Sequence, residues 1–274
     1  MTNDNQLEGK SSAAKEPDTE TGGQMTFFEH LVELRKRIIH ALAATLIGAT
    51  VGWFVAPRFV VFITKPILAA LANAKVAQQH LIYTNPTGFL SLLISLSIYL
   101  GIVMASPYIL YQVWLFVAPA LYKHERSAIT GFLFSTVVLF LAGIAFGYFV
   151  MLPHLLDFLI GMGQKGPVEP FISVNDYFDM ILMVLLGLGL VFEMPILIFF
   201  LTLFGIVTPK FLVQNSKYAI LAITIVAAVI TPTPDALTML IFMAPMVGLY
   251  FVGVGVSWVV VTRRERRLAA EARG

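Results

Sequence analysis

Six long apolar stretches constrain the fold of this chain more than any other feature of its sequence. They cover approximately residues 38–56, 88–111, 128–152, 180–204, 217–231 and 236–261. Hydrocarbon offers an open backbone no hydrogen-bond partner, so each stretch is predicted to be a helix. Most of them can cross a membrane core about 30 Å thick at about 1.5 Å of rise per residue. The chain is therefore predicted to be an all-α, polytopic membrane protein with six transmembrane helices.

Composition limits the classes of function that the chain can have. Charged residues make up 12% of the sequence, against about 25% in soluble domains. The absence of cysteine excludes disulfides, thiolate nucleophiles and cysteine-bound metals. The sequence holds no metal-ligand spacing, no phosphate-binding glycine loop and no HExxH or GxSxG motif. We therefore expect no enzymatic activity, no metal and no cofactor.

The flanks of the six stretches differ in charge. Of the 18 Lys and Arg residues, four flank one side: Arg58, Lys65, Lys75 and Lys165. The others flank the opposite side, which the positive-inside rule assigns to the cytoplasm together with both termini. Segments 112–127 and 205–216 are then cytoplasmic, and segments 57–87, 153–179 and 231–235 are external.

The sequence divides into a membrane domain and two polar ends. The tail at 1–24 lacks apolar periodicity and is predicted to be disordered. The membrane domain covers 25–261, and a basic cytoplasmic tail follows at 262–274. Between the last two spans, the prolines of TPTPD at 231–235 predict a sharp turn in which Asp235 caps the next helix.

Two cytoplasmic stretches admit both a structural and a functional interpretation. TFFEHLVELRKRII at 26–39 predicts an amphipathic interfacial helix that feeds into the first span. Thr26 and Glu29 fit a capping box, and Glu33 can pair with Arg37 four residues on. YQVWLFVAPALYKHERS at 111–127 fits an aromatic belt that ends in a turn. The basic clusters at 35–37 and 263–267 suit anionic lipid better than nucleic acid.

Glu193 lies near the centre of the fourth stretch, two residues before Pro195. A charged side chain at that depth costs about 2.5–3.5 kcal/mol on insertion scales. Pro195 removes a backbone donor and breaks the helix. Glu193 either satisfies a backbone group near this break or performs a function within the membrane, and an intramembrane acid favours the second.

Four motifs occur in a fixed order along the chain: HLVELRKRI at 30–38, YQVWLFVAPALYKHE at 111–125, FEMP at 192–195 and TPTPD at 231–235. On six spans with both ends inside, this arrangement resembles the TatC family, the multispanning receptor subunit of the twin-arginine protein translocase. The resemblance implies a cupped helical bundle in the bacterial plasma membrane that binds the signal peptides of folded precursor proteins. It also implies TatB- and TatA-like single-span partners, further copies of the chain in one complex, and export driven by the proton-motive force.

The resemblance further implies roles for individual residues. The matching positions are, for signal-peptide binding, Glu33, Arg35, Phe116 and Glu125; for partner contact, Glu193; and for external segments, Pro66 and Asp235. A carboxylate binds a guanidinium through two parallel hydrogen bonds, which Lys cannot reproduce. We therefore expect Glu33 and Glu125 to converge on the signal's arginines. We expect Glu193 to face a concave, lipid-exposed pocket, shaped in part by Pro195, and to contact a partner's span.

Other functions stay open on the residues alone. A proton- or ion-coupled secondary transporter could use Glu193 as a relay, although the other spans hold no second mid-membrane charge. A membrane-embedded enzyme would need a nucleophile and base that the sequence does not offer. A structural scaffold would not need Glu193 at mid-membrane.

Overall fold

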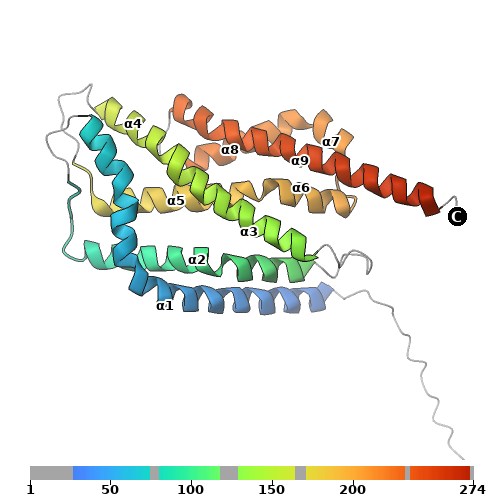
Figure 1. Cartoon of the computed structure of the whole chain (residues 1–274), viewed down its shortest axis with the longest axis horizontal. Helices are drawn as coiled ribbons and strands as arrows, with labels where there is room; N and C mark the ends of the chain where they lie inside the picture. The colour runs from blue at the N-terminus through green and yellow to red at the C-terminus, as the bar shows by residue number, and fades with distance from the viewer. Residues whose placement is uncertain (1–26, 75–79, 118–128, 164–170, 232–234, 272–274) are drawn as a thin grey trace, which may run out of the picture.

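The computed structural model describes residues 27–74, 80–117, 129–163, 171–231 and 235–271. The helices, in chain order, are α1 (Phe27–Asn73), α2 (Gly88–Val117), α3 (Ile129–Phe146), the π-helix η3 (Gly147–Met151), α4 (Leu152–Gly163), α5 (Val174–Phe192), α6 (Met194–Leu203), α7 (Pro209–Gln214), α8 (Ser216–Ile230) and α9 (Ala236–Glu271). In the described part, five helical segments are long and apolar enough to cross a membrane, and α8 is a shorter apolar helix. The all-α membrane fold is therefore confirmed (Figure 1).

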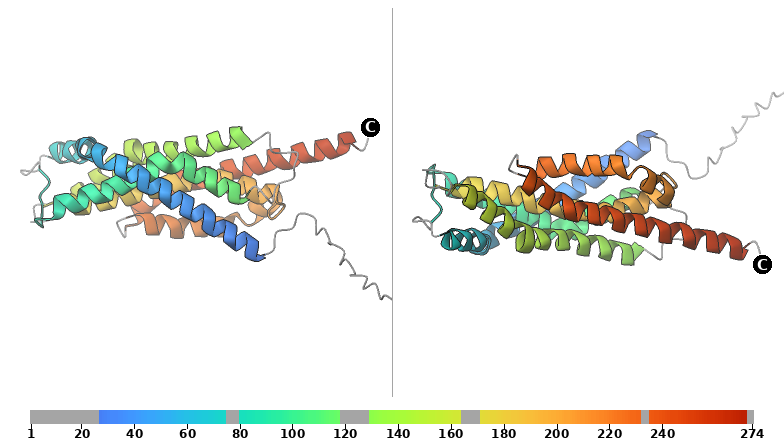
Figure 2. Two further views of the ribbon diagram at one scale, coloured as in Figure 1. Left: turned by 90° about the horizontal axis from the view of Figure 1, so that it is seen from below. Right: turned by 90° about the horizontal axis from the view of Figure 1, so that it is seen from above.

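The two ends of the bundle separate the connections into two groups. Figure 1 shows the start of α1, the end of α2, the start of α3 and the end of α9 at one end of the molecule. The ends of α1, α4 and α8 lie toward the other end. The views in Figure 2 agree. The helix ends next to the segments predicted to be cytoplasmic therefore share one end, and those next to the segments predicted to be external share the other.

Helix α1 corrects two expectations. The first external segment was expected to begin at residue 57, but α1 continues through Pro57 and Pro66 to Asn73. Pro66 therefore lies within a helix and not in a loop. The second half of α1, which carries both prolines, turns away from the first half and crosses the end of the bundle (Figure 1). Proline bends a helix because it lacks the N–H and crowds the carbonyl four residues before it.

Two tyrosines bind backbone carbonyls near Pro66. Pro66 leaves the Phe62 carbonyl without its helical N–H donor. The hydroxyl of Tyr148, in η3, donates to the Phe62 oxygen at 2.8 Å. The hydroxyl of Tyr177, in α5, donates to the neighbouring Ile63 oxygen at 2.7 Å. The second half of α1 is thus fastened to two other helices, and all of these residues except Phe62 and Pro66 are buried.

The core has two parts. One joins the second half of α1 to α2, α4 and the first half of α5, around Leu96, Leu152 and Phe178. The other joins α5, α6, α8 and α9, around Leu188 and Met246. Helix α5 contributes to both clusters, so it connects the two halves of the bundle.

Helices α1 and α2 touch along a line of glycines. A Cβ added to Gly101 would lie 2.5 Å from the Ala49 nitrogen, and one added to Gly48 would lie 2.7 Å from the Gly101 oxygen. A Cβ at Gly52 would meet the Ser97 oxygen at the same distance of 2.7 Å. These distances leave no room for any side chain, so the three glycines set how closely the two helices approach.

Several other helices extend beyond their predicted limits. Helix α2 continues to Val117, α4 continues to Gly163, and α9 continues to Glu271. The residues expected in loops at 112–117 and 153–163, and most of the expected basic tail at 262–274, are therefore helical. The predicted limits follow hydropathy, which indicates the residues that lie in the membrane core. A helix can continue beyond that core into water as long as its backbone hydrogen bonds are kept. The short fifth apolar stretch forms a helix, α8, with 15 residues.

Candidate functional site

The candidate site lies where the first turns of α1 meet the last turns of α2. Nη2 of Arg37 donates to Oε1 of Glu33 at 2.8 Å, and Nη1 of Arg37 donates to Oε1 of Gln112 at 3.3 Å. The exposed side-chain fractions are 24% for Arg37 and 16% for Glu33. Gln112 is buried. The predicted Glu33–Arg37 pair is confirmed, and it is tied to a second helix.

An aromatic contact lies beside this cluster. The rings of His30 and Phe116 stack, with centroids 4.3 Å apart and an interplanar angle of 20°. Phe116 was expected in a loop, but it lies in the last turn of α2. Arg35 is exposed on α1 and shares neither contact. Thr26 and Glu125 lie outside the described residues, so the expected convergence of Glu33 and Glu125 stays a prediction.

The start of α1 does not form a separate interfacial helix. It is the first part of one continuous helix, and its apolar side chains Phe28, Leu31 and Ile38 are exposed. Glu33 and Arg37 instead face α2. The periodicity was interpreted as a helix that lies along the membrane surface, with its polar side toward water. In this bundle part of the polar side instead faces α2, and the apolar side is left to face lipid.

The polar atoms of the cluster are incompletely paired. Oε2 of Glu33 and Nε of Arg37 are both buried and have no hydrogen-bond partner among the described residues. Glu33 therefore retains one carboxylate oxygen that can accept hydrogen bonds from a ligand. Buried polar atoms of this kind are uncommon, because leaving them unpaired costs free energy.

Sequence reasoning did not identify His30 and Gln112 as parts of this site. The available signal was an amide side chain at position 112 within an otherwise apolar and aromatic stretch. Its partner could not be identified, because that requires the register between α1 and α2.

Glu193 lies at a break between α5 and α6. Its own N–H donates to the Leu190 carbonyl at 3.1 Å, and its carbonyl accepts from Ile196 at 3.0 Å. Pro195, in the first turn of α6, is at a position where the missing N–H costs nothing. The helix therefore breaks at Glu193, two residues before Pro195.

The carboxylate of Glu193 does not close this break. It makes no capping hydrogen bond at the start of α6. Its Oε1 atom is buried and has no hydrogen-bond partner among the described residues. The backbone satisfies the break without the side chain, so the structural interpretation of Glu193 as a local cap does not hold.

Asp235 caps α9, as the sequence predicts. Its Oδ1 accepts from the Thr238 N–H at 2.7 Å. Removing such a cap typically costs about 1 kcal/mol. This contact accounts for Asp235 through local structure, and Pro66 is accounted for by the bend of α1.

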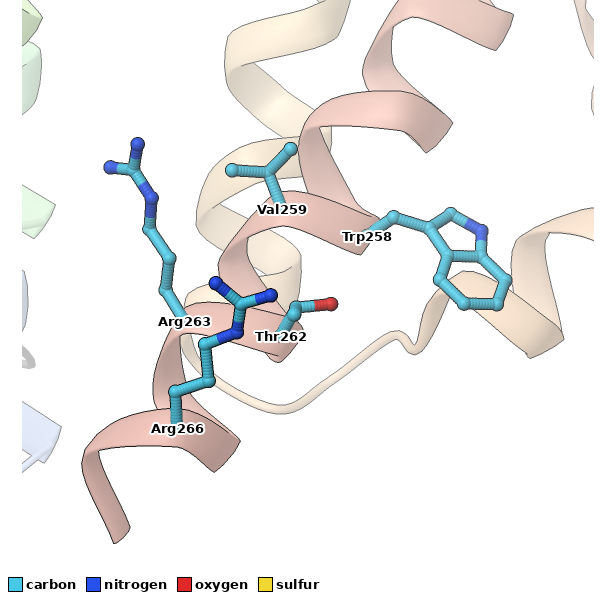
Figure 3. A pocket seen from close by; sticks show the side chains of 5 residues that line it. All are labelled: Trp258, Val259, Thr262, Arg263 and Arg266. Carbon is cyan, nitrogen blue, oxygen red and sulfur yellow. The ribbon is translucent and has the colours of Figure 1, made fainter. Parts of the chain in front are cut away.

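The end of α9 carries the basic cluster. Trp258, Val259, Thr262, Arg263 and Arg266 line a shallow depression on one side of this helix (Figure 3). All five of these side chains are exposed. Along α9, apolar side chains are followed by arginines. This order suits the boundary between lipid acyl chains and anionic headgroups.

The described residues contain no group of three His, Cys, Asp or Glu side chains that could hold a metal ion.

Comparisons with known proteins agree on one family. The family model for TatC, the Sec-independent protein translocase protein, matches residues 29–245. The Sec-independent protein translocase protein TatC of Koribacter versatilis (strain Ellin345) is 46% identical over 250 residues, which cover 90% of this chain and 91% of that protein. TatCy of Bacillus subtilis (strain 168) is 35% identical over 249 residues, which cover 90% of this chain and 94% of that protein.

A solved structure extends the match to the fold. The crystal structure of the twin arginine translocase receptor TatC is similar to this chain with a TM-score of 0.74 and 35% sequence identity. The similarity covers 85% of this chain and 99% of that one. The chain therefore belongs to the TatC family, the multi-pass membrane proteins that serve as receptor subunits of the twin-arginine, Sec-independent protein translocase.

Proposed function

We propose that this chain binds the paired arginines of twin-arginine signal peptides at the α1–α2 end, on the cytoplasmic side of the bacterial plasma membrane. The observation that carries the proposal is the half-buried carboxylate of Glu33, whose Oε2 has no hydrogen-bond partner among the described residues. The distribution of Lys and Arg supports the orientation, because Arg35, Lys36 and Arg37 lie at this end. Both termini are then cytoplasmic, and the chain crosses the membrane six times.

The chemistry of the site favours arginine over lysine. A guanidinium can place two parallel N–H groups on one carboxylate, whereas an ammonium offers a single point of charge. The ring of Phe116, stacked on His30, gives the carboxylate an aromatic border on which a second guanidinium can stack. Arg35 and Glu125 complete the proposed binding surface, with Glu125 supplied by the segment between α2 and α3.

A photocrosslinking experiment tests this function. A photoreactive residue at Lys36, which is exposed beside the cluster, is expected to crosslink a labelled precursor with an Arg-Arg signal. A Lys-Lys version of the signal should give little or no product. The matched control places the probe at Phe54, 73% exposed further along α1, where neither precursor should react. Equal crosslinking of both precursors at Lys36 would place recognition elsewhere.

We infer that Glu193 contacts the single span of a TatA- or TatB-like partner, with Pro195 shaping the surface there. Its buried, unpartnered Oε1 supports this inference. An interhelical hydrogen bond in hydrocarbon is worth about 0.6–2 kcal/mol, which fixes the register of a helix pair but does not assemble a complex alone. Further copies of the chain and membrane energisation by the proton-motive force complete the proposed mechanism.

Glu193→Gln is expected to retain part of the partner contact, because an amide can still donate and accept hydrogen bonds. Glu193→Ala should lose most of it. Crosslinking between α5 or α6 and the partner's span measures both effects. Leu197→Ala is the control, since Leu197 is 59% exposed one turn further on and offers no hydrogen bond. If Glu193→Ala crosslinks like the unchanged protein, Glu193 is not the contact.

Two further assignments follow from the same arrangement. The arginines of α9 lie at the end assigned to the cytoplasm, where anionic lipid is the partner that they suit. The alternative of a proton- or ion-coupled secondary transporter using Glu193 loses its support, because membership in the translocase family assigns the chain to protein transport.

A further inference from the structure

The Glu33 carboxylate already holds a guanidinium in this structure, and it belongs to the chain itself. Arg37 reaches Glu33 at 2.8 Å. We propose that Arg37 is an internal substitute for a signal arginine, which occupies Glu33 until a signal peptide displaces it and which thereby lowers the affinity of the empty site. The inference rests on the proposed function and adds an autoinhibitory residue to it.

The pairing between Arg37 and Glu33 is incomplete, and this makes it replaceable. The structure gives one contact, from Nη2 to Oε1, and leaves Oε2 of Glu33 and Nε of Arg37 buried without a partner among the described residues. Both side chains stand on the same helix, four residues apart, which limits how well the two planar groups can align. An incoming guanidinium, free of that constraint, can use both carboxylate oxygens through the stronger two-bond geometry.

Gln112 gives the displaced Arg37 a second partner. Its Oε1 accepts from Nη1 of Arg37 at 3.3 Å, near the long end of the hydrogen-bond range. Gln112 is buried on α2 and carries no charge, so it does not compete with Glu33 for the signal's arginines. When Arg37 leaves Glu33, a shortened bond to Gln112 keeps its guanidinium paired and lowers the cost of the exchange.

This competition lowers the affinity of the site for every ligand. A ligand that must displace an occupant binds with its intrinsic affinity multiplied by the fraction of sites that are free. That fraction depends only on the Arg37–Glu33 pair, so it lowers the affinities for an ammonium and for a guanidinium by the same factor. The preference for arginine comes from the forked contact with Glu33, and the internal pair keeps the weaker ligand from occupying the site at ordinary concentrations.

The test uses the full chain in lipid vesicles and labelled synthetic signal peptides with Arg-Arg or Lys-Lys. Arg37→Gln is expected to tighten binding of the Arg-Arg peptide by about three- to fivefold, as for removal of a pair of this exposure. Binding of the Lys-Lys peptide should tighten by the same factor, so that the ratio between the two stays unchanged. Lys36→Gln removes the same charge from the neighbouring exposed residue and should tighten binding of either peptide by less than Arg37→Gln does.

Two further variants separate displacement from a structural role. Arg37→Lys keeps the charge but loses the fork, and its affinity for the Arg-Arg peptide should lie between those of the unchanged protein and Arg37→Gln. Gln112→Leu should weaken Arg-Arg binding when Arg37 is present and have no effect in the Arg37→Gln background. A contact that only supported the fold would weaken binding in both backgrounds.

The outcomes distinguish this inference from the proposed function. If the unchanged chain binds Arg-Arg and Lys-Lys peptides equally, the proposed function fails. If it discriminates, but Arg37→Gln binds both peptides with unchanged or lower affinity, the function stands and the role of Arg37 is overturned. Higher affinity for both peptides at an unchanged ratio supports displacement, and a gain no larger than that of Lys36→Gln overturns it.

Discussion

Gly101→Ile is expected to abolish signal-peptide crosslinking at the α1–α2 end without altering any residue of that end. A Cβ at position 101 would lie 2.5 Å from the Ala49 nitrogen and 2.8 Å from the Thr45 oxygen. Both are backbone atoms of α1, so neither can rotate away, and the helices must separate. Separation moves Glu33 and Arg37 away from Gln112 and breaks the stack between His30 and Phe116.

Spin-label distances between α1 and α2 measure this separation directly, and the lack of native cysteine makes the labelling specific. Labels at Val32 and Val113, both exposed, should report a longer and broader distance in Gly101→Ile. Gly248→Ile is the matched control, because a side chain at Gly248 in α9 meets nothing within 4 Å. Unchanged distances and crosslinking in Gly101→Ile would show that the glycine contact is not required.

Glu33→Gln is expected to weaken binding of an Arg-Arg signal peptide by about 30-fold, which corresponds to about 2 kcal/mol. This is the low end of the cost of removing one partner of a buried charged pair, because Glu33 keeps 16% of its side chain exposed. The amide presents one acceptor oxygen and no charge, so the forked geometry is lost. Peptide titration against the full chain in vesicles measures the change.

The control for Glu33→Gln is Glu265→Gln, the same change at an exposed acid in α9. The affinity of Glu265→Gln for the Arg-Arg peptide should equal that of the unchanged protein within experimental error. Non-specific adsorption of the peptide to the vesicles should be equal for both variants. A similar loss in Glu265→Gln would mean that net charge, and not the Glu33 carboxylate, governs binding.

The sequence predicts the existence of the helices better than their ends. Within the described residues, the six apolar stretches are almost entirely helical, because lipid dictates both the composition and the backbone structure of a span. The ends were misplaced wherever a helix leaves the apolar region, as in the arginine-rich part of α9. The first span was expected to end at residue 56, but α1 continues through both of its prolines to Asn73, and near Pro66 the hydroxyls of Tyr148 and Tyr177 bind backbone carbonyls.

The candidate site was only partly visible in the sequence. The Glu33–Arg37 pair follows from a spacing of four residues on one helix. The contacts to Gln112 and between His30 and Phe116 depend on the register of α1 against α2, which contacts at Gly48, Gly52 and Gly101 define. A single sequence does not state which glycines face one another. Glu193 illustrates the same limit. A break in the helix was expected at Pro195, but it lies at Glu193.

The tyrosines near Pro66 also bear on water and ions. A proline inside a helix leaves a carbonyl oxygen unpaired, and in membrane proteins ordered water can pair with such a group. Here the hydroxyl of Tyr148 pairs with the Phe62 carbonyl, and that of Tyr177 binds the Ile63 carbonyl beside it. The chain thus keeps a proline inside α1 without needing water at that carbonyl, and so without a wet defect there through which protons could leak. A protein that resides permanently in an energised membrane must meet that condition between transport events.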